Sequence, residues 1–179
     1  MVYLFLADGF EIVEAMAPID MLRRADIEIK TVGVTGKTVT SSCGIEVNAD
    51  ITIDKFEYKN ADAVILPGGG DGVINLEKNS AVQNVIDRAV EDDIYICAIC
   101  AAPSILGNKG LLSGVEATAY PSFTKFLASA VLSDKYVVTD GKYITARGAG
   151  VSVDFGLEIV KALAGEEKAD EVRRTIQCR

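Results

Sequence analysis

Short apolar runs alternate along this chain with longer segments in which apolar residues recur every three or four positions. The apolar runs, bounded by turn-forming residues, are Val2–Ala7, Ile27–Val34, Ala63–Leu66 and Ile94–Ile99. The helical spacing covers Glu11–Arg24, Ala81–Glu91, Ala102–Asn108, Val151–Ala164 and Lys168–Ile176. Strands that are apolar on both faces and alternate with helices predict an α/β fold, a doubly wound, mostly parallel sheet with helices on both faces.

Two further segments predict hairpins. Tyr136–Thr139 and Tyr143–Thr145 are joined through Asp140-Gly141-Lys142, and Asp-Gly satisfies the positive φ of a primed turn. Thr38–Val47 alternates weakly, which suggests a second hairpin at the sheet edge. Pro18 interrupts the first predicted helix, so we expect a bend there.

The composition favours one acidic domain. A chain of 179 residues with 49% hydrophobic content can bury one sizeable core, and no linker divides it, so we predict a single domain over residues 1–179. A net charge of −8 with scattered Lys and Arg argues against nucleic acid and membranes as partners. The four cysteines form no dense secreted framework, so we expect a cytoplasmic location.

The chain contains no histidine. This excludes Ser-His-Asp and Cys-His catalysis and the usual zinc sites. We expect neither a metal nor a cofactor. Carboxylates remain as the groups that can move protons.

Cys100 stands where the fourth apolar run gives way to a predicted helix, in Ile99-Cys100-Ala101-Ala102-Pro103. Pro103 suits the first position of a helix because it has no N–H and its φ is preset. The free N–H groups and the macrodipole at a helix start stabilise an anion, so we expect a lowered pKa and a reactive Cys100 thiolate. Small residues such as Ala101 suit the sharp turn of a nucleophile elbow. An inert, buried cysteine is the alternative.

Glu14 lies within the apolar stripe of the first predicted helix. A carboxyl group that faces the interior loses hydration, so its pKa rises and it can hold a proton near neutral pH. Such a group can donate to a thiolate or act as general acid and base on an adduct. The alternative is a glutamate that faces solvent at the edge of the stripe.

The glycine-rich segment Leu66–Gly72 follows a predicted buried strand. Glycines allow backbone N–H groups to approach a ligand or an oxyanion closely, which makes Gly68 and Gly69 candidate binding residues. The segment matches neither a P-loop nor a dinucleotide fingerprint, and a simple turn is the alternative. Because ligands of doubly wound sheets bind at the carboxyl ends of strands, we expect Asp8-Gly9, this segment and Cys100 to face one cleft.

The other cysteines and one cationic segment are weaker candidates. Cys97 and Cys100 form a C-x-x-C, but three residues of strand span about 10 Å, beyond the ~4.4–6.8 Å between disulfide-linked Cα atoms. Cys97 is therefore predicted to lie in the core. Cys43 in a predicted turn and Cys178 in the C-terminal tail have no visible activating partner. Arg147–Gly150 precedes a helix and is either a carboxylate or phosphate site or a simple loop.

Together these motifs resemble the ThiJ/PfpI superfamily in their order and spacing along nearly the whole chain. The motifs are Gly9–Glu14, Pro18–Arg24, Leu66–Gly69, Ala98–Pro103 and Arg147–Gly150. The branch most similar is that of the parkinsonism-associated deglycase. The resemblance implies a flavodoxin-like fold and a homodimer.

The same resemblance implies roles for individual residues. Cys100 would be the reactive thiol and Glu14 its protonated carboxyl partner, while the N–H groups of Gly69 and Ala101 would bind an oxyanion. Members of the family are variously described as glyoxalases acting on methylglyoxal, as deglycases repairing early glycation adducts, and as oxidation sensors whose cysteine forms a sulfinate.

Three positions depart from the family pattern. Protease-like relatives have a histidine directly after the cysteine, where this chain has Ala101, so an intracellular peptidase is disfavoured. The most similar branch has a histidine at the position of Tyr120, and tyrosine ordinarily stays neutral at pH 7. A basic residue that relatives have near the dimer-side edge of the pocket is replaced in this chain, and Cys43 lies close to that position.

Three hypotheses of function follow. The first is a glyoxalase or deglycase in which Cys100 adds to a reactive dicarbonyl or a glycated substrate and Glu14 relays the proton. The second is an oxidation-sensing stress-response protein without rapid turnover, in which peroxide converts Cys100 to a sulfinate. The third is a flavin-binding module, which the missing Ser/Thr-rich phosphate loop disfavours.

Overall fold

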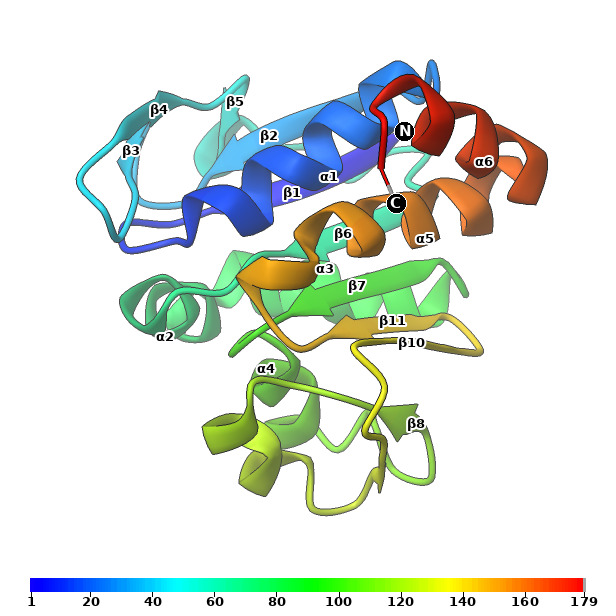
Figure 1. Cartoon of the computed structure of the whole chain (residues 1–179). Helices are drawn as coiled ribbons and strands as arrows, with labels where there is room; N and C mark the ends of the chain where they lie inside the picture. Colours follow the sequence, from blue (N-terminus) through cyan, green and yellow to red (C-terminus); the bar gives the residue numbers. More distant parts are fainter. Residues whose placement is uncertain (179) are drawn as a thin grey trace.

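The computed structural model describes residues 1–178 and contains a seven-stranded sheet between two layers of helices (Figure 1). The sheet has the order β10-β11-β7-β6-β1-β2-β5. All its neighbouring strands are parallel except β10 and β11. The strands are β1 (Val2–Leu6), β2 (Ile29–Gly33), β5 (Ile51–Thr52), β6 (Ala63–Leu66), β7 (Tyr95–Ile99), β10 (Val137–Asp140) and β11 (Tyr143–Ala146). The predicted α/β class with a mostly parallel sheet is confirmed.

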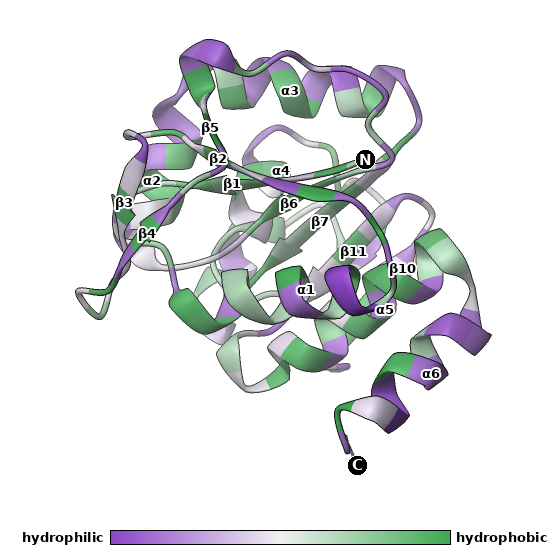
Figure 2. Ribbon diagram, turned by 90° about the horizontal axis from the view of Figure 1, so that it is seen from above, coloured by the Kyte–Doolittle hydropathy of each residue, from purple (hydrophilic) through white to green (hydrophobic). Residues whose placement is uncertain are grey.

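Each face of the sheet has its own hydrophobic cluster. In β1, Val2, Leu4 and Leu6 pack toward one layer, and Tyr3 and Phe5 toward the other. The first layer contains α1 (Ile12–Arg24), α5 (Ser152–Ala164) and α6 (Glu166–Thr175). The second contains α2 (Gly70–Lys78), α3 (Ser80–Glu91) and α4 (Pro103–Asn108). Figure 2 shows α3 on one side of the sheet and α1, α5 and α6 on the other. Burial on both faces explains why the central strands are continuously apolar.

Both predicted hairpins are present, but the second does not lie at the edge of the main sheet. Asp140 and Tyr143 flank the turn between β10 and β11 as expected. The second hairpin, β3 (Thr38–Thr40) with β4 (Glu46–Asn48), forms a two-stranded sheet of its own, and β5 takes the edge of the main sheet. The short strands β8 (Glu116–Ala117) and β9 (Val131–Leu132) pair with each other.

Helix α2 was not predicted, because its first residues lie in the glycine-rich segment. Val73 and Leu76 anchor it in the second cluster. A Cβ on Gly72 would lie 2.8 Å from the Phe10 backbone, so this helix requires glycine where propensity alone disfavours it. The described residues also form three 3₁₀ segments: η1 (Ile53–Lys55), η2 (Pro121–Leu127) and η3 (Ala149–Val151).

Within the part of the chain that the structure describes, every helix is too short or too polar to cross a membrane.

Helix α1 carries Glu14 and runs through Pro18 without interruption. It packs closely on α5, because a Cβ on Gly156 would lie 2.9 Å from both Pro18 Cα and Met21 Cγ. Gly156 therefore sets the distance between the two helices.

Gly156→Val should lower the free energy of unfolding by about 1–3 kcal/mol, because the added methyl groups force α1 away from α5. Urea denaturation followed by circular dichroism measures this. Ala164→Val, at an exposed position of the same helix, should cost well under half as much. Equal losses in the two variants would contradict close packing at Gly156.

Candidate active site

Cys100 occupies a sharp turn between β7 and α4. Its φ is +65°, in the left-handed region that residues with a side chain rarely adopt. The backbone is fixed on both sides, since the Cys100 N–H donates to the Ala146 carbonyl and its own carbonyl accepts from the Tyr120 N–H, both at 2.8 Å. Such strain persists only where the surroundings hold it, and it is the geometry of a nucleophile elbow.

Glu14 reaches the same point from α1 and is fully buried. Its Oε2 accepts a hydrogen bond of 2.9 Å from the Gly68 N–H. Its Oε1 is buried, and among residues 1–178 no group satisfies it with ordinary hydrogen-bond geometry. A Cβ placed on Gly148 would lie 3.9 Å from both this oxygen and the Cys100 sulfur. The carboxyl group and the thiol therefore converge in front of Gly148, and the alternative of a solvent-facing Glu14 is wrong.

The glycine-rich loop after β6 fits closely against both groups. A Cβ on Gly68 would overlap Glu14 Oε2 and lie 2.6 Å from Cys100 Cβ, so only glycine fits there. Gly69 has a φ of +95°, and its Cβ would collide with the Gly9 carbonyl. The Gly68 N–H is taken by Glu14, so in this structure Gly68 positions the carboxyl group instead of facing the cavity.

Burial raises the pKa of Glu14 to about 7. The Cys100 thiol and the Gly68 N–H oppose this rise, and the negative charge of Glu11 adds to it. Because the carboxyl group has no cationic partner among its perturbing neighbours, desolvation dominates. Glu14 therefore changes its charge near neutral pH.

The pKa of the Cys100 thiol is raised to about 12, first by burial and then by the charge of Glu14. The expectation of a lowered pKa is wrong, because α4 has only six residues and burial outweighs its effect. The N–H groups of Ala101 and Gly69 do act on the sulfur and lower its pKa in part. The contribution of Glu14 disappears when it is protonated, so the titrations of the two groups are coupled.

A cavity of about 320 Å³ opens over this pair. Gly69, Ala101 and Tyr120 from the predicted set line it together with Cys100 and Glu14. The lining residues that sequence reasoning missed are Glu11 and Phe123, and the lining also includes Gly70 of the predicted glycine-rich segment and Ala149. Ala149 belongs to the Arg147–Gly150 segment, which follows β11 at the same end of the sheet. The sequence marks this segment as either a carboxylate or phosphate site or a simple loop. Phe123 lies in η2, which gave no sequence signal of its own.

The other cysteines do not contribute to this cavity. Cys97 is fully buried in the core, as predicted, and burial raises its pKa strongly. Cys43 is exposed, with its sulfur 3.3 Å from the Ser41 hydroxyl. The Cys178 sulfur lies 3.9 Å from an Arg173 nitrogen. Within residues 1–178, no three His, Cys, Asp or Glu side chains cluster to hold a metal ion.

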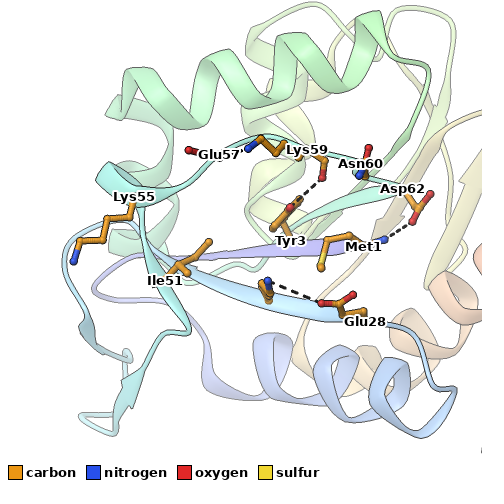
Figure 3. A pocket seen from close by; sticks show the side chains of 10 residues that line it. Met1, Tyr3, Glu28, Ile51, Lys55, Glu57, Lys59, Asn60 and Asp62 are labelled. Atoms are coloured by element: carbon orange, nitrogen blue, oxygen red, sulfur yellow. Dashed lines mark hydrogen bonds and ion pairs between the residues drawn. The ribbon is translucent and has the colours of Figure 1, made fainter.

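A larger cavity, of about 620 Å³, lies at the opposite end of the sheet (Figure 3). It is lined by the starts of parallel strands β1 and β2, near Met1 and Lys30, and by the segment before β6. In Figure 3 the Tyr3 hydroxyl donates to the Lys59 carbonyl. Ligands of doubly wound sheets bind at the carboxyl ends of strands, so this cavity is the weaker candidate.

The fold and site define a class: an α/β protein with a cysteine on a nucleophile elbow and a buried carboxyl group beside it. Residues 1–162 match the DJ-1/PfpI family, and the chain belongs to that family.

Individual relatives span nearly the whole chain. The chain is 36% identical to protein dj-1beta of Drosophila melanogaster over 172 residues, 94% of this chain and 92% of the relative. The crystal structure of Drosophila DJ-1beta superimposes with a TM-score of 0.95 and 34% identity, covering 99% and 97% of the two chains. Oxidized DJ-1 of Toxoplasma gondii gives a TM-score of 0.94 at 29% identity, covering 99% and 97%. A deglycase of Thermococcus kodakarensis is 28% identical over 165 residues, 90% of this chain and 98% of the relative.

The raised pKa of Glu14 makes stability depend on pH. Between its ordinary value of 4.5 and about 7, folded Glu14 holds a proton that the unfolded chain has lost. Raising the pH through this range therefore favours unfolding, by on the order of 3 kcal/mol at about 1.4 kcal/mol per pKa unit. The free energy of unfolding in urea should fall from pH 5 to pH 8.

Glu14→Gln stays neutral and should remove most of this fall, whereas Glu46→Gln, in exposed β4, should retain it. The comparison is clean because the chain has no histidine to titrate in the same range. The same pH dependence in wild type and Glu14→Gln would show that Glu14 is ionised throughout.

Proposed function

We propose that this protein is a cysteine-dependent enzyme of the glyoxalase or deglycase type. Its substrates are small reactive dicarbonyls or early glycation adducts. One observation carries the proposal: a strained thiol and a buried carboxyl group of raised pKa share one cavity in a chain that has no histidine. The deglycase name of the Thermococcus relative supports the same chemistry.

The reaction starts from the thiol and the ionised carboxylate. The Cys100 sulfur attacks the aldehyde carbon of methylglyoxal while its proton passes through Glu14 to the carbonyl oxygen, which gives a hemithioacetal and leaves Glu14 ionised. Glu14 then takes a proton from the former aldehyde carbon and returns it to the neighbouring ketone carbon. The hydroxyl proton of the hemithioacetal moves to the former ketone oxygen, and the adduct becomes a thioester. Water hydrolyses the thioester to a hydroxy acid and restores the thiol. The raised pKa of the thiol fits this sequence, because deprotonation accompanies attack and no stable thiolate is required.

Two backbone N–H groups stabilise the negative charge that develops on the sulfur and on the carbonyl oxygen during the reaction. The N–H groups of Gly69 and Ala101 lie at the sulfur and stabilise negative charge there. In the adduct they are the donors available to the oxygen of the attacked carbonyl. Tyr120 lines the same cavity and is half exposed, so its hydroxyl can donate to a bound substrate.

We also propose that the protein is a cytoplasmic homodimer. Two large apolar side chains, Val13 of α1 and Ile45 of the β3–β4 turn, are 47% and 52% exposed and offer apolar contact area. The four cysteines are free thiols, which fits a reducing compartment.

Cys100→Ser and Glu14→Gln should each lower kcat/KM for methylglyoxal at least about 100-fold, since each removes a group that bonds to or transfers a proton in the reaction. Wild-type kcat/KM should rise with pH through about 7, as Glu14 becomes ionised to accept the thiol proton. Lactate formation, measured as initial rate, reports the turnover.

Cys43→Ser is the matched control, because it removes an exposed thiol that does not line the cavity. It should retain wild-type kcat/KM. Full activity in Glu14→Gln would end the proposed proton relay, and equal activity in Cys100→Ser would end covalent catalysis.

The second candidate function is that of an oxidation sensor. An oxidized relative is known, from Toxoplasma, and the same site could hold a sulfinate through the N–H groups of Gly69 and Ala101 and a protonated Glu14. In this case the site would bind the oxidised cysteine rather than a substrate.

Under mild peroxide, Cys43→Ser protein should gain a stable sulfinate at Cys100 if the protein is a sensor, because Glu14 and two N–H groups stabilise it. Peptide mass spectrometry measures this, and Glu14→Gln should shift the product toward the sulfonate. A stable sulfinate without dicarbonyl turnover favours the sensor. Turnover without a stable sulfinate favours the enzyme.

A further inference from the structure

A second cavity opens directly beside the Cys100 cavity. It encloses about 440 Å³ and shares Tyr120 and Ala149 with its neighbour. Its remaining lining residues are Pro121, Tyr136, Arg147, Gly148, Gly150 and Val151. We call this second cavity the Arg147 groove.

Gly148 connects the groove to the reactive sulfur. A Cβ on Gly148 would lie 3.5 Å from the Tyr120 ring and 3.9 Å from Cys100 Sγ. A side chain at this position would therefore fill the space between the sulfur and the tyrosine. With glycine there, a molecule bonded to Cys100 can extend past Tyr120 into the groove.

The two cavities differ in charge. The lining of the Cys100 cavity includes Glu11 and Glu14 and no Lys or Arg. The lining of the groove includes Arg147 and no Asp or Glu. A negatively charged group would be repelled at the first cavity whenever a carboxyl group there is ionised, and attracted in the second.

Arg147 is held in place without a carboxylate. Its guanidinium lies over the Tyr136 ring, 5.5 Å from the centroid, and one nitrogen donates at 3.4 Å to the Asp134 carbonyl. Within residues 1–178, Arg147 has no carboxylate oxygen within ion-pair distance. A guanidinium has five N–H donors in a planar fork that matches a carboxylate. The stacking on Tyr136 therefore fixes a cation whose donors remain available.

We propose that the Arg147 groove binds the carboxylate end of an extended α-oxoaldehyde substrate, whose planar or apolar body lies against Tyr120 and Tyr136. This rests on the proposed function. The reacting end sits at Cys100, where the aldehyde takes up water overall to become a hydroxy acid, and no external oxidant or reductant is needed. The groove selects substrates that carry an anion at the end remote from the carbonyl.

The activity test compares phenylglyoxal with 4-carboxyphenylglyoxal, which differ only in the remote carboxylate. Wild-type kcat/KM should be about 10-fold higher for the carboxylated compound, as expected for a hydrogen bond between charged groups. Arg147→Gln should abolish this preference. Arg174→Gln, an exposed arginine of α6 outside both cavities, is the control and should keep the preference.

A binding test with unreactive analogues measures the role of the groove independently of catalysis at Cys100. Isothermal titration calorimetry of 4-acetylbenzoate and acetophenone, unreactive analogues of the two aldehydes, should show tighter binding of the carboxylate to wild type. Arg147→Gln should lose the difference, and Arg147→Lys, which keeps the charge without the fork, should retain part of it. Circular dichroism confirms that each variant is folded.

Each outcome decides one claim. Equal binding of the two analogues to wild type, or a preference that survives in Arg147→Gln, overturns the groove proposal. No binding of either analogue, with a dimer that dissociates in Arg147→Gln, also overturns it and identifies a second copy as the occupant. If no aldehyde is turned over but the binding preference depends on Arg147, the proposed function fails and the groove stands.

Discussion

The arrangement of this site depends on one buried carboxyl group that has hydrogen bonds for only one of its two oxygens. The Gly68 N–H fixes Oε2 of Glu14, and Oε1 is left facing the Cys100 sulfur without a strong donor. An unsatisfied buried oxygen is costly, and a proton is the simplest group that relieves the cost. The charge of the carboxyl group therefore alters the pKa of the thiol, and the two groups titrate as a coupled pair.

The sheet brings these groups together because three of its parallel strands end at the same edge. Strands β1, β6 and β7 are neighbours or next neighbours, and their following loops carry Gly9, Gly68 and Cys100. The loops then contact one another directly, with the Glu11 N–H donating to the Gly68 carbonyl at 3.0 Å. Glycine is required where backbones approach this closely, so the fold and the site impose the same residues at the same positions.

Much of this could be predicted from the sequence, and the failures have physical causes. The continuous apolar runs identified the central strands because both faces of the sheet are covered. The stripe position of Glu14 and the elbow around Cys100 identified the central pair. The pKa of Cys100 was predicted in the wrong direction, because its burial and the charge of Glu14 depend on contacts between distant segments. Helix α2 and the cavity residue Phe123 were missed for the same reason: local propensity does not report what a segment packs against.

The two margins of the main sheet differ from its centre. On one side it ends in β5, which has two residues, and on the other in β10, which runs antiparallel to its neighbour β11. At β10, the Asp140 carboxylate also accepts from the Glu116 N–H of the neighbouring β8. A margin as short as β5 offers few unpaired backbone groups to another molecule's strand. The β5 margin is thus a poor template for intermolecular strand addition and the aggregation that would follow.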